Sequence, residues 1–351
     1  MINEKALKEY LLIQFPDASG VSITKVGAGV QGAGFLIEIS FEQDVKSYVV
    51  KGLFPEGLGH DYPSDRAAVF LLDLDEYKTL PRHVHAVDVL AELPDGSIKS
   101  IGGGMEYYLL MERARGRDYF SDLRELSYKQ NLQEGDIVKI KSMASYLAEI
   151  HSIKKDSRHL YWRKIRDTIG HGECLMGVFD TYPDGLLSYA EMAEIEKLCI
   201  DWRAKLKLKT HRLCQIHGDF HPGNIWFKEN AFTEADFILL DRSRGPWGDP
   251  ADDITALTIN YIFFSLIYFS EVRDAYLEAL NLFFSEYIAI TGDEELFEVL
   301  APFYAFRGVV VANPLFYPDV KLEIRRKIFR LVKNILNQER FQIDMINEYM
   351  K

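Results

Sequence analysis

The sequence predicts an α+β protein with two lobes, a small one built on an antiparallel sheet and a larger one that is mostly helical. Three observations support this prediction. The chain has 351 residues, which is more than one typical core holds and enough for two lobes. Short runs with strand character, separated by turns rich in Gly and Pro, fill its first part. Apolar residues at helical spacing dominate the remainder.

The composition is that of an ordinary globular protein, with 48% hydrophobic residues. The net charge of -12 argues against nucleic acid or an anionic membrane as the main partner, and it permits a cationic substrate without demonstrating one. Cys174, Cys199 and Cys214 lack metal-binding spacing, which favours a reducing compartment. There is no signal-peptide core, and the longest apolar stretch, residues 261–269, is well below the roughly 20 residues that span a bilayer. We therefore expect a cytoplasmic protein.

The first elements follow from the spacing of apolar residues. Residues 4–15 have a helical period and stop at Pro16. Residues 21–26, 35–39 and 48–51 alternate or run apolar as strands do. These patterns predict one helix and three strands at the start of the small lobe.

The segment between the first two strands contains Gly27, Gly29 and Gly32 in the pattern Gly-x-Gly-x-x-Gly. A dinucleotide-binding fold would require a helix after these glycines. The residues that follow are β-branched or aromatic, so a hairpin is better supported. Backbone amides of such a hairpin can approach nucleotide phosphates without obstruction from side chains. A turn that binds no ligand is the alternative.

Further elements complete the small lobe. We expect a helix from Ser64, as its N-cap, to about Leu80, with Pro81 as the stop. Residues 87–101 are predicted to form a hairpin around the turn sequence Pro-Asp-Gly-Ser. Residues 107–114 are predicted to be an apolar strand that runs into a polar connector, near the domain boundary.

The larger lobe contains two polar features of interest. A helix is expected over residues 137–153, with His151 as a core histidine that has polar partners. The charge cluster at residues 163–167 is expected to be the solvated face of a helix. His171 and Glu173 stand between glycines, so they belong either to a binding element or to a connector in which Glu173 caps a helix.

Residues 217–241 carry the strongest chemical signal. They contain His-Gly-Asp-Phe-His-Pro-Gly-Asn and then two apolar runs short enough to be the strands of a hairpin. Asp219 and Asn224 precede the first run, and Asp241 follows the second. Because a hairpin returns its chain, all three side chains can meet at one end. Two carboxylates and an amide oxygen suit magnesium.

A zinc site is the rival interpretation of this stretch, because His217 and His221 are four residues apart. That spacing works on a helix. Gly218, Pro222 and Gly223 disfavour a helix here, so the zinc interpretation is the weaker one.

The motif His-Gly-Asp-x-x-x-x-Asn, followed by an Asp after the next strand, resembles the aminoglycoside phosphotransferase and choline kinase group. These are small-molecule kinases with a two-lobed protein-kinase-like fold. The resemblance implies that Asp219 is the catalytic base and that Asn224 and Asp241 bind Mg2+. It also implies that His217 is a structural loop residue.

The same resemblance divides the chain into a nucleotide-binding lobe, residues 1–112, and a catalytic and substrate-binding lobe, residues 113–351. The residues implied in nucleotide binding are Gly27, Gly29, Gly32, Lys51, Asp65, Glu112 and Ala114. Lys51 would hold the α- and β-phosphates. Asp65 is the acidic partner chosen for Lys51, although a first-turn carboxylate favoured by the helix dipole explains it equally well. Backbone groups from Glu112 to Ala114 would meet adenine.

The acceptor side is assigned to a helical insertion over residues 155–212, because insertions of this kind help form the acceptor pocket in the resembled family. His171 and Glu173 lie within it and are predicted, with the neighbouring charge cluster at residues 163–167, to lie near the acceptor pocket. Arg242 is a further candidate, since it stands where family members often have an aromatic or acidic residue.

Four of the charged residues that follow the motif have roles that we expect from the sequence. Asp249, in a Gly-Asp-Pro typical of the family, is expected to brace the catalytic loop, and Asp252 and Asp253 to cap the next helix. Arg307 lies among apolar residues and needs a partner if it is buried; a structural Asp is favoured over an acidic ligand group.

The predicted activity is ATP- and magnesium-dependent phosphorylation of a hydroxyl group, less often an amine, on a small molecule. A nucleotide-binding pseudokinase would keep the fold without turnover. A protein kinase-like regulator would need a longer segment than the one that joins Asp241 to Asp249. A dinucleotide-dependent oxidoreductase rests on the glycines alone.

Overall fold

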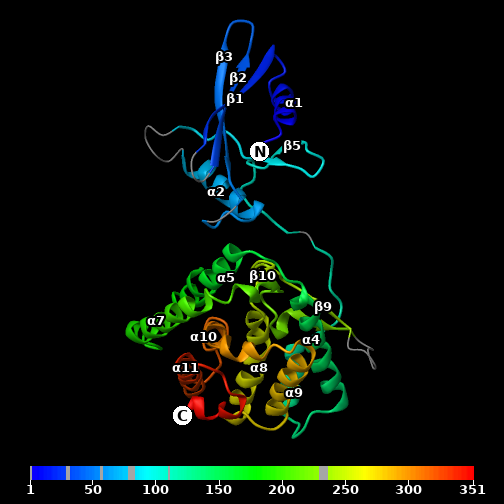
Figure 1. Cartoon of the computed structure of the whole chain (residues 1–351), viewed down its shortest axis with the longest axis vertical. Helices are drawn as coiled ribbons and strands as arrows, with labels where there is room; N and C mark the ends of the chain where they lie inside the picture. The colour runs from blue at the N-terminus through cyan, green and yellow to red at the C-terminus, as the bar shows by residue number, and fades with distance from the viewer. Residues whose placement is uncertain (1, 29–31, 56–57, 78–83, 110, 229–235) are drawn as a thin grey trace. The chain divides into compact units, whose positions relative to one another are not determined.

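The computed structural model describes residues 2–28, 32–55, 58–77, 84–109, 111–228 and 236–351. The chain forms two compact units, Met1–Met111 and Glu112–Lys351 (Figure 1). This division lies beside the boundary expected at residue 112, whose meaning for nucleotide binding stays a prediction.

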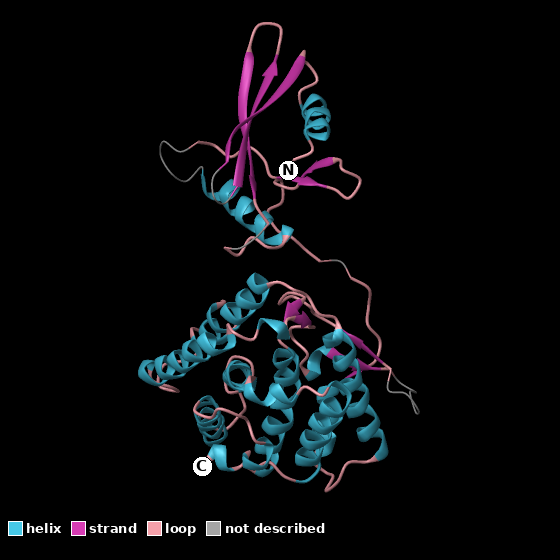
Figure 2. Cartoon of the chain, viewed as in Figure 1, coloured by secondary structure: helices cyan, strands magenta, loops and turns pink. Residues whose placement is uncertain are grey.

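The first unit is built on a three-stranded antiparallel sheet in the order β1-β2-β3 (Figure 2). Its elements are α1 (Glu4–Gln14), β1 (Gly20–Ala28), β2 (Gly32–Ser40) and β3 (Val45–Leu53). The alternating residues Phe35, Ile37 and Ile39 of β2 are buried in one cluster with Leu7 of α1. The predicted helix and three strands are therefore confirmed, and a strand rather than a helix follows the glycine-rich segment, as expected.

The next helix starts earlier than predicted. α2 spans Pro63–Glu76 with Tyr62 as its N-cap residue, so the assignment of Ser64 as the cap is wrong. The reason is Pro63, which lacks an N–H group and fits the first helical position. The expected end at Leu80 and Pro81 lies outside the described residues.

The predicted hairpin over residues 87–101 is confirmed in a shorter form, with β4 (Leu90–Glu92) paired to β5 (Ile98–Ser100). The predicted strand over residues 107–114 is wrong, because no described residue of that segment is in a strand. An apolar run becomes a strand only where a neighbouring strand takes its hydrogen bonds. Tyr108 and Leu109 are instead largely exposed.

The second unit is mostly helical, as predicted. Its α-helices are α3 (Tyr119–Leu126), α4 (Glu134–Ser152), α5 (Arg158–Gly170), α6 (Leu175–Phe179), α7 (Tyr189–Leu206), α8 (Pro250–Phe269), α9 (Asp274–Thr291), α10 (Leu300–Val311) and α11 (Leu322–Leu336). α8 packs against both α9 and α10 and lies between them in Figure 1. Every residue from 250 to 266 is buried, so α8 forms the centre of this unit.

Short strands fix both ends of the motif in the second unit. β6 (Arg117–Asp118), β8 (Ile225–Phe227) and β9 (Phe237–Leu239) form one antiparallel sheet, and β7 (Cys214–Gln215) pairs with β10 (Trp247–Gly248). The predicted hairpin of residues 217–241 is thus present as β8 and β9. None of the described helices has the length and apolar character needed to cross a membrane.

Candidate active site

The loop that starts at His217 is held by the first turn of α8. The buried carboxylate of Asp253 accepts hydrogen bonds from the backbone N–H groups of His217 (2.7 Å) and Gly218 (2.7 Å). Asp253 Oδ2 also lies 3.2 Å from Nε2 of His151, whose Nδ1 lies 2.9 Å from the Tyr287 hydroxyl. Asp253 therefore fixes where the loop begins, and His151 is the core histidine with polar partners that the sequence predicts.

Asp249 does not brace this loop, contrary to the expectation, because its carboxylate is used elsewhere. It caps α8 by accepting the backbone N–H two residues further on (3.0 Å). It also accepts hydrogen bonds from Nε of Arg212 (2.9 Å) and from the hydroxyl of Tyr161 (2.8 Å). The expectation that Asp252 and Asp253 cap α8 is also wrong. Asp249 occupies the N-cap position, and the carboxylates of Asp252 and Asp253 bind other groups.

Both histidines of the motif accept hydrogen bonds inside the loop. His217 Nδ1 accepts the N–H of Asp219 (3.2 Å), and His221 Nδ1 accepts the N–H of Gly223 (3.1 Å). Between them Gly218 has a φ of +88°, a conformation that glycine adopts without steric cost. The loop has no α-helix that would put the two imidazoles on one face, so they shape the loop backbone.

Asp219, the candidate base, is bonded to two arginines through one oxygen. Its Oδ1 accepts hydrogen bonds from Nη1 of Arg307 (2.5 Å) and Nη1 of Arg244 (3.2 Å). Burial alone raises the pKa of a carboxyl group. Here the positive charges of Arg307 and Arg244 outweigh burial and hold the pKa of Asp219 below its usual value. Asp219 is therefore ionised at neutral pH although it is buried.

Arg307 finds the structural acidic partner that the sequence favours, and also Asp219. Its Nη2 donates to Asp252 Oδ1 (2.8 Å) and to the carbonyl oxygen of Gly218 (3.0 Å). Asp252 Oδ2 in turn lies 2.6 Å from Nζ of Lys164. The expectation of a solvated face at residues 163–167 is wrong for Lys164, which is buried because it points to this carboxylate. Sequence spacing carries no signal for this pairing.

Asn224 and Asp241 are neighbours at one end of the β8–β9 hairpin. The backbone N–H of Leu240 donates to the carbonyl oxygen of Asn224 (3.0 Å). Asp241 is the next residue after Leu240, so this hydrogen bond brings the backbones of Asn224 and Asp241 close together. Nδ2 of Asn224 donates to the carbonyl oxygen of Asp219 (3.0 Å), which leaves the amide oxygen for another partner. The Asp241 carboxylate is exposed. An amide oxygen beside a carboxylate fits magnesium, which prefers oxygen ligands.

The acceptor-side candidates make local contacts. Arg242 donates through Nε (3.1 Å) and Nη2 (2.8 Å) to the carbonyl oxygen of Ile216, so it supports the start of the loop. His171 and Glu173 are exposed in the connector between α5 and α6, where His171 Nδ1 accepts the backbone N–H of Glu173 (3.2 Å). The N-cap residue of α6 is Cys174, so Glu173 does not occupy the capping position. Contact of either residue with an acceptor stays a prediction.

In the first unit, the glycine-rich segment and Lys51 lie in one row of the sheet. Gly34 on β2 is paired with Gly27 on β1 and with Lys51 on β3, and the Lys51 side chain is exposed. A Cβ atom on Gly32 would lie 2.1 Å from a backbone oxygen of β3, so glycine is needed there for strand packing. Gly29 lies outside the described residues.

The remaining nucleotide-side candidates have mixed outcomes. Asp65 accepts the N–H of Tyr62 (2.7 Å), which is the helix-start role given as the alternative to pairing with Lys51. Among the described residues, no backbone hydrogen bond involves Glu112 or Ala114. Their groups are thus unused by secondary structure, and both the pairing of Asp65 with Lys51 and the adenine contact stay predictions.

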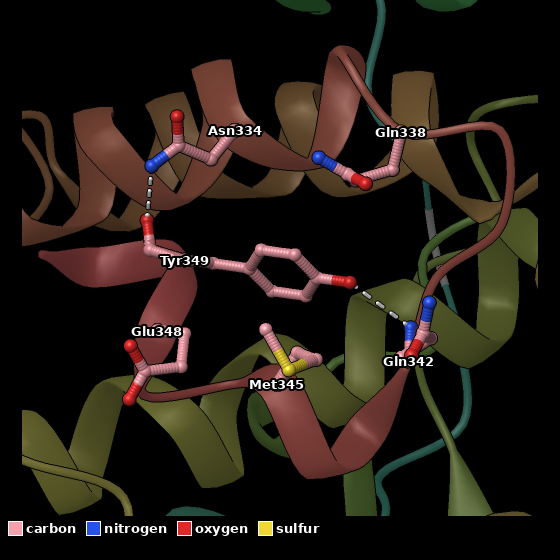
Figure 3. Close-up of a pocket in the computed structure, with 6 residues that line it drawn as sticks. All are labelled: Asn334, Gln338, Gln342, Met345, Glu348 and Tyr349. Atoms are coloured by element: carbon pink, nitrogen blue, oxygen red, sulfur yellow. Dashed lines mark hydrogen bonds between the residues drawn. The ribbon is translucent and has the colours of Figure 1, made fainter.

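A separate cavity of about 270 Å³ lies at the C-terminal end, between α11 and the short 3-10 helices that follow it (Figure 3). Its lining consists of Asn334, Gln338, Gln342, Met345, Glu348 and Tyr349. The ring of Tyr349 extends into it, and the Tyr349 hydroxyl accepts the backbone N–H of Gln342 (3.2 Å). No residue of the motif lines this cavity, so it is not part of the candidate active site.

A buried ionised aspartate, an amide and a carboxylate at one end of a hairpin, and a division into a sheet-based unit and a helical unit are features that a kinase-like phosphotransferase requires. The model of the phosphotransferase enzyme family (APH) matches residues 62–288. The chain therefore belongs to the phosphotransferase enzyme family. The matched residues include the whole motif and begin after the glycine-rich segment and Lys51.

Several solved structures resemble this chain and are distant from it in sequence. An amicoumacin kinase in complex with AMP-PNP, Ca2+ and Ami is 13% identical, with 98% of this chain and 100% of that chain covered and a TM-score of 0.41. The choline kinase LicA from Streptococcus pneumoniae is 15% identical, with 95% and 98% covered and a TM-score of 0.36. An ethanolamine kinase from Plasmodium vivax is 11% identical, with 94% and 81% covered and a TM-score of 0.36. No curated protein matches this chain in sequence.

Proposed function

We propose that this protein transfers the γ-phosphoryl group of ATP, bound as its magnesium complex, to a hydroxyl group of a small molecule. The observation that supports this best is Asp219, a buried but ionised carboxylate one loop away from Asn224 and Asp241. Phosphoryl transfer needs a residue that orients the attacking hydroxyl and oxygen ligands for the metal that neutralises the phosphates. These residues supply both.

Asp219 holds the acceptor hydroxyl and takes its proton as the acceptor oxygen attacks the γ-phosphorus. The bond between that phosphorus and the bridging oxygen breaks, and ADP leaves. Asn224 and Asp241 would hold magnesium, which supplies positive charge to the phosphate oxygens when bound. Lys51 is assigned to the α- and β-phosphates, together with backbone amides of the glycine-rich segment.

The first experiment is a screen of ATP consumption over sugars, nucleosides, amino alcohols and aminoglycosides, with and without magnesium. With the acceptor so found, Asp219→Asn should lower turnover by about 10² to 10⁴-fold, because the base is lost. Asp219→Asn should still bind magnesium-ATP in calorimetry. Asp241→Ala should remove the dependence of ATP binding on magnesium.

Asp236→Asn is the matched control, because Asp236 is an exposed acid at the other end of the same hairpin, paired with Lys228. It should leave both turnover and magnesium dependence unchanged. Turnover close to the parental rate in a folded Asp219→Asn protein would refute the proposed function.

A further inference from the structure

The two carboxylate oxygens of Asp219 have different surroundings. Oδ1 accepts hydrogen bonds from both Arg307 and Arg244. Within the part of the chain that the structure describes, Oδ2 accepts no hydrogen bond, yet it is not among the buried atoms that lack a partner. Two donors on one oxygen fix the rotation of the carboxylate and leave the other oxygen accessible.

Arg307 is itself held in place by groups from two other elements. Its guanidinium spans Asp219, the Gly218 carbonyl oxygen and Asp252, and the side chain is only 5% exposed. Asp252 stands in the first turn of α8 and is fixed from the far side by Lys164 of α5. An arginine bonded to three acceptors on two elements has little freedom to rotate.

The packing around Lys164 makes this contact possible. A Cβ atom on Gly248 would lie 3.0 Å from Cγ of Lys164 and 2.5 Å from Cδ1 of Ile216. The absence of a side chain at Gly248 therefore leaves room for the lysine stem to reach Asp252. The chain of contacts Lys164–Asp252–Arg307–Asp219 joins α5, α8 and α10 to the loop.

We propose that Arg307 is a positioning residue for Asp219, which holds Oδ1 so that Oδ2 faces the acceptor hydroxyl, and that Asp252 and Lys164 hold Arg307 in turn. This inference rests on the proposed function, since it assigns Asp219 the role of base. Arg307 does not touch the acceptor; it acts through the orientation of the carboxylate.

Substitution of Arg307 leaves each carboxylate with one cationic partner. Asp219 keeps Arg244 and Asp252 keeps Lys164, so Arg307→Met and Arg307→Lys should fold. Arg307→Met should lower kcat by about 100-fold, because a base displaced by roughly 1 Å loses about that factor. Arg307→Lys keeps the charge but cannot reach all three acceptors. Its kcat should lie between those of the parental protein and of Arg307→Met. The KM for ATP should change less than about threefold in both.

Arg212→Lys is the matched control, because Arg212 is also buried and also joins a carboxylate at the start of α8, Asp249, to a second acid, Asp293. It should lower the melting temperature and keep kcat. The assay uses the acceptor from the screen, or single-turnover hydrolysis of magnesium-ATP with water as acceptor.

Asp219→Asn is measured alongside to separate the two proposals. A native protein without any turnover, or an Asp219→Asn protein with the parental rate, overturns the proposed function and this inference with it. An inactive Asp219→Asn protein together with an Arg307→Met protein within about threefold of the parental kcat overturns only the positioning role. Equal losses of kcat in Arg307→Lys and Arg212→Lys would also overturn it, since they would indicate a general structural effect.

Discussion

At the scale of single residues, the three cysteines show how burial controls chemistry. Cys174, Cys199 and Cys214 are free and buried. Burial raises the pKa of Cys174 to about 11 and raises the pKa values of Cys199 and Cys214 as well. The thiolate is the reactive form, and it is scarce in all three.

We therefore expect the three thiols to resist Ellman's reagent in the native protein at pH 8, where about one thousandth of Cys174 is thiolate. After unfolding in guanidinium chloride, all three thiols should react with the reagent within the dead time of mixing. Absorbance of the released thionitrobenzoate before and after unfolding checks this. A native thiol that reacts as fast as free cysteine would contradict it.

The relative placement of residues was predictable from the sequence where the residues are close along the chain, whereas their roles stay predictions. Asp219, Asn224 and Asp241 could be placed together because one hairpin connects them, and the structure has that hairpin. The sequence indicated that Arg307 needs an acid but not that the acid includes Asp219, 88 positions away. The pairing of Lys164 with Asp252 was not predictable at all, since a charged cluster on a helix usually faces solvent.

At the scale of elements, the N-cap and the first turn of α8 carry three acids with three separate tasks. Asp249 caps the helix, Asp252 binds Lys164 and Arg307, and Asp253 holds the loop. Burial raises the pKa of Asp252, but the charges of Lys164 and Arg307 outweigh it and bring the pKa to about 2. The folded chain therefore binds the Asp252 carboxylate in its ionised form, and protonation requires a pH near 2.

This pKa gives a pH dependence with a definite sign. A carboxyl whose folded pKa lies below its unfolded value stabilises the protein above the unfolded pKa, and the contribution is lost as pH falls through the folded pKa. For Asp252 the window runs from about pH 4 down to about pH 2, and the contribution is about 2 kcal/mol.

The difference in unfolding free energy between the native protein and Asp252→Asn should thus be constant above pH 5. At pH 2 it should be smaller by about 2 kcal/mol. Urea unfolding at several pH values measures it. A difference that stays the same over this range would show that Asp252 is not held as an anion.

Elements with a clear local period were predicted well, and those that depend on a distant partner were not. The helix at Glu4–Gln14 and the hairpin of β8 and β9 follow from spacing and turn residues. Residues 107–114 have the composition of a strand, but a strand also requires a neighbour in register, which composition does not specify. The start of α2 was predicted too late, because the prediction places the cap at Ser64 whereas Pro63 is already the first helical residue.

At the scale of the whole molecule, the net charge of -12 does not describe the surroundings of Asp219. The buried acids there are already bonded, Asp219 and Asp252 to cations and Asp253 to backbone N–H groups. Arg244 and Arg307 add positive charge at the same place. A polycationic acceptor would need unpaired carboxylates close to the reacting hydroxyl.

We therefore expect neutral or acidic hydroxylated compounds to be better acceptors than polycationic aminoglycosides. In the screen proposed above, aminoglycosides should not raise ATP consumption above the rate with water. A higher kcat/KM for an aminoglycoside than for neutral sugars and nucleosides, measured at physiological ionic strength, would refute this.

The complete burial of the first part of α8 has a consequence for how the protein opens. Amide groups exchange with solvent hydrogen when their surroundings open locally, and the central elements of a core open last. The amides of residues 251–266 should hence be among the slowest to exchange deuterium in the second unit. The N–H groups of His217 and Gly218 end on Asp253 in that helix, so the loop that carries Asp219 is attached to the part of the protein that opens least often.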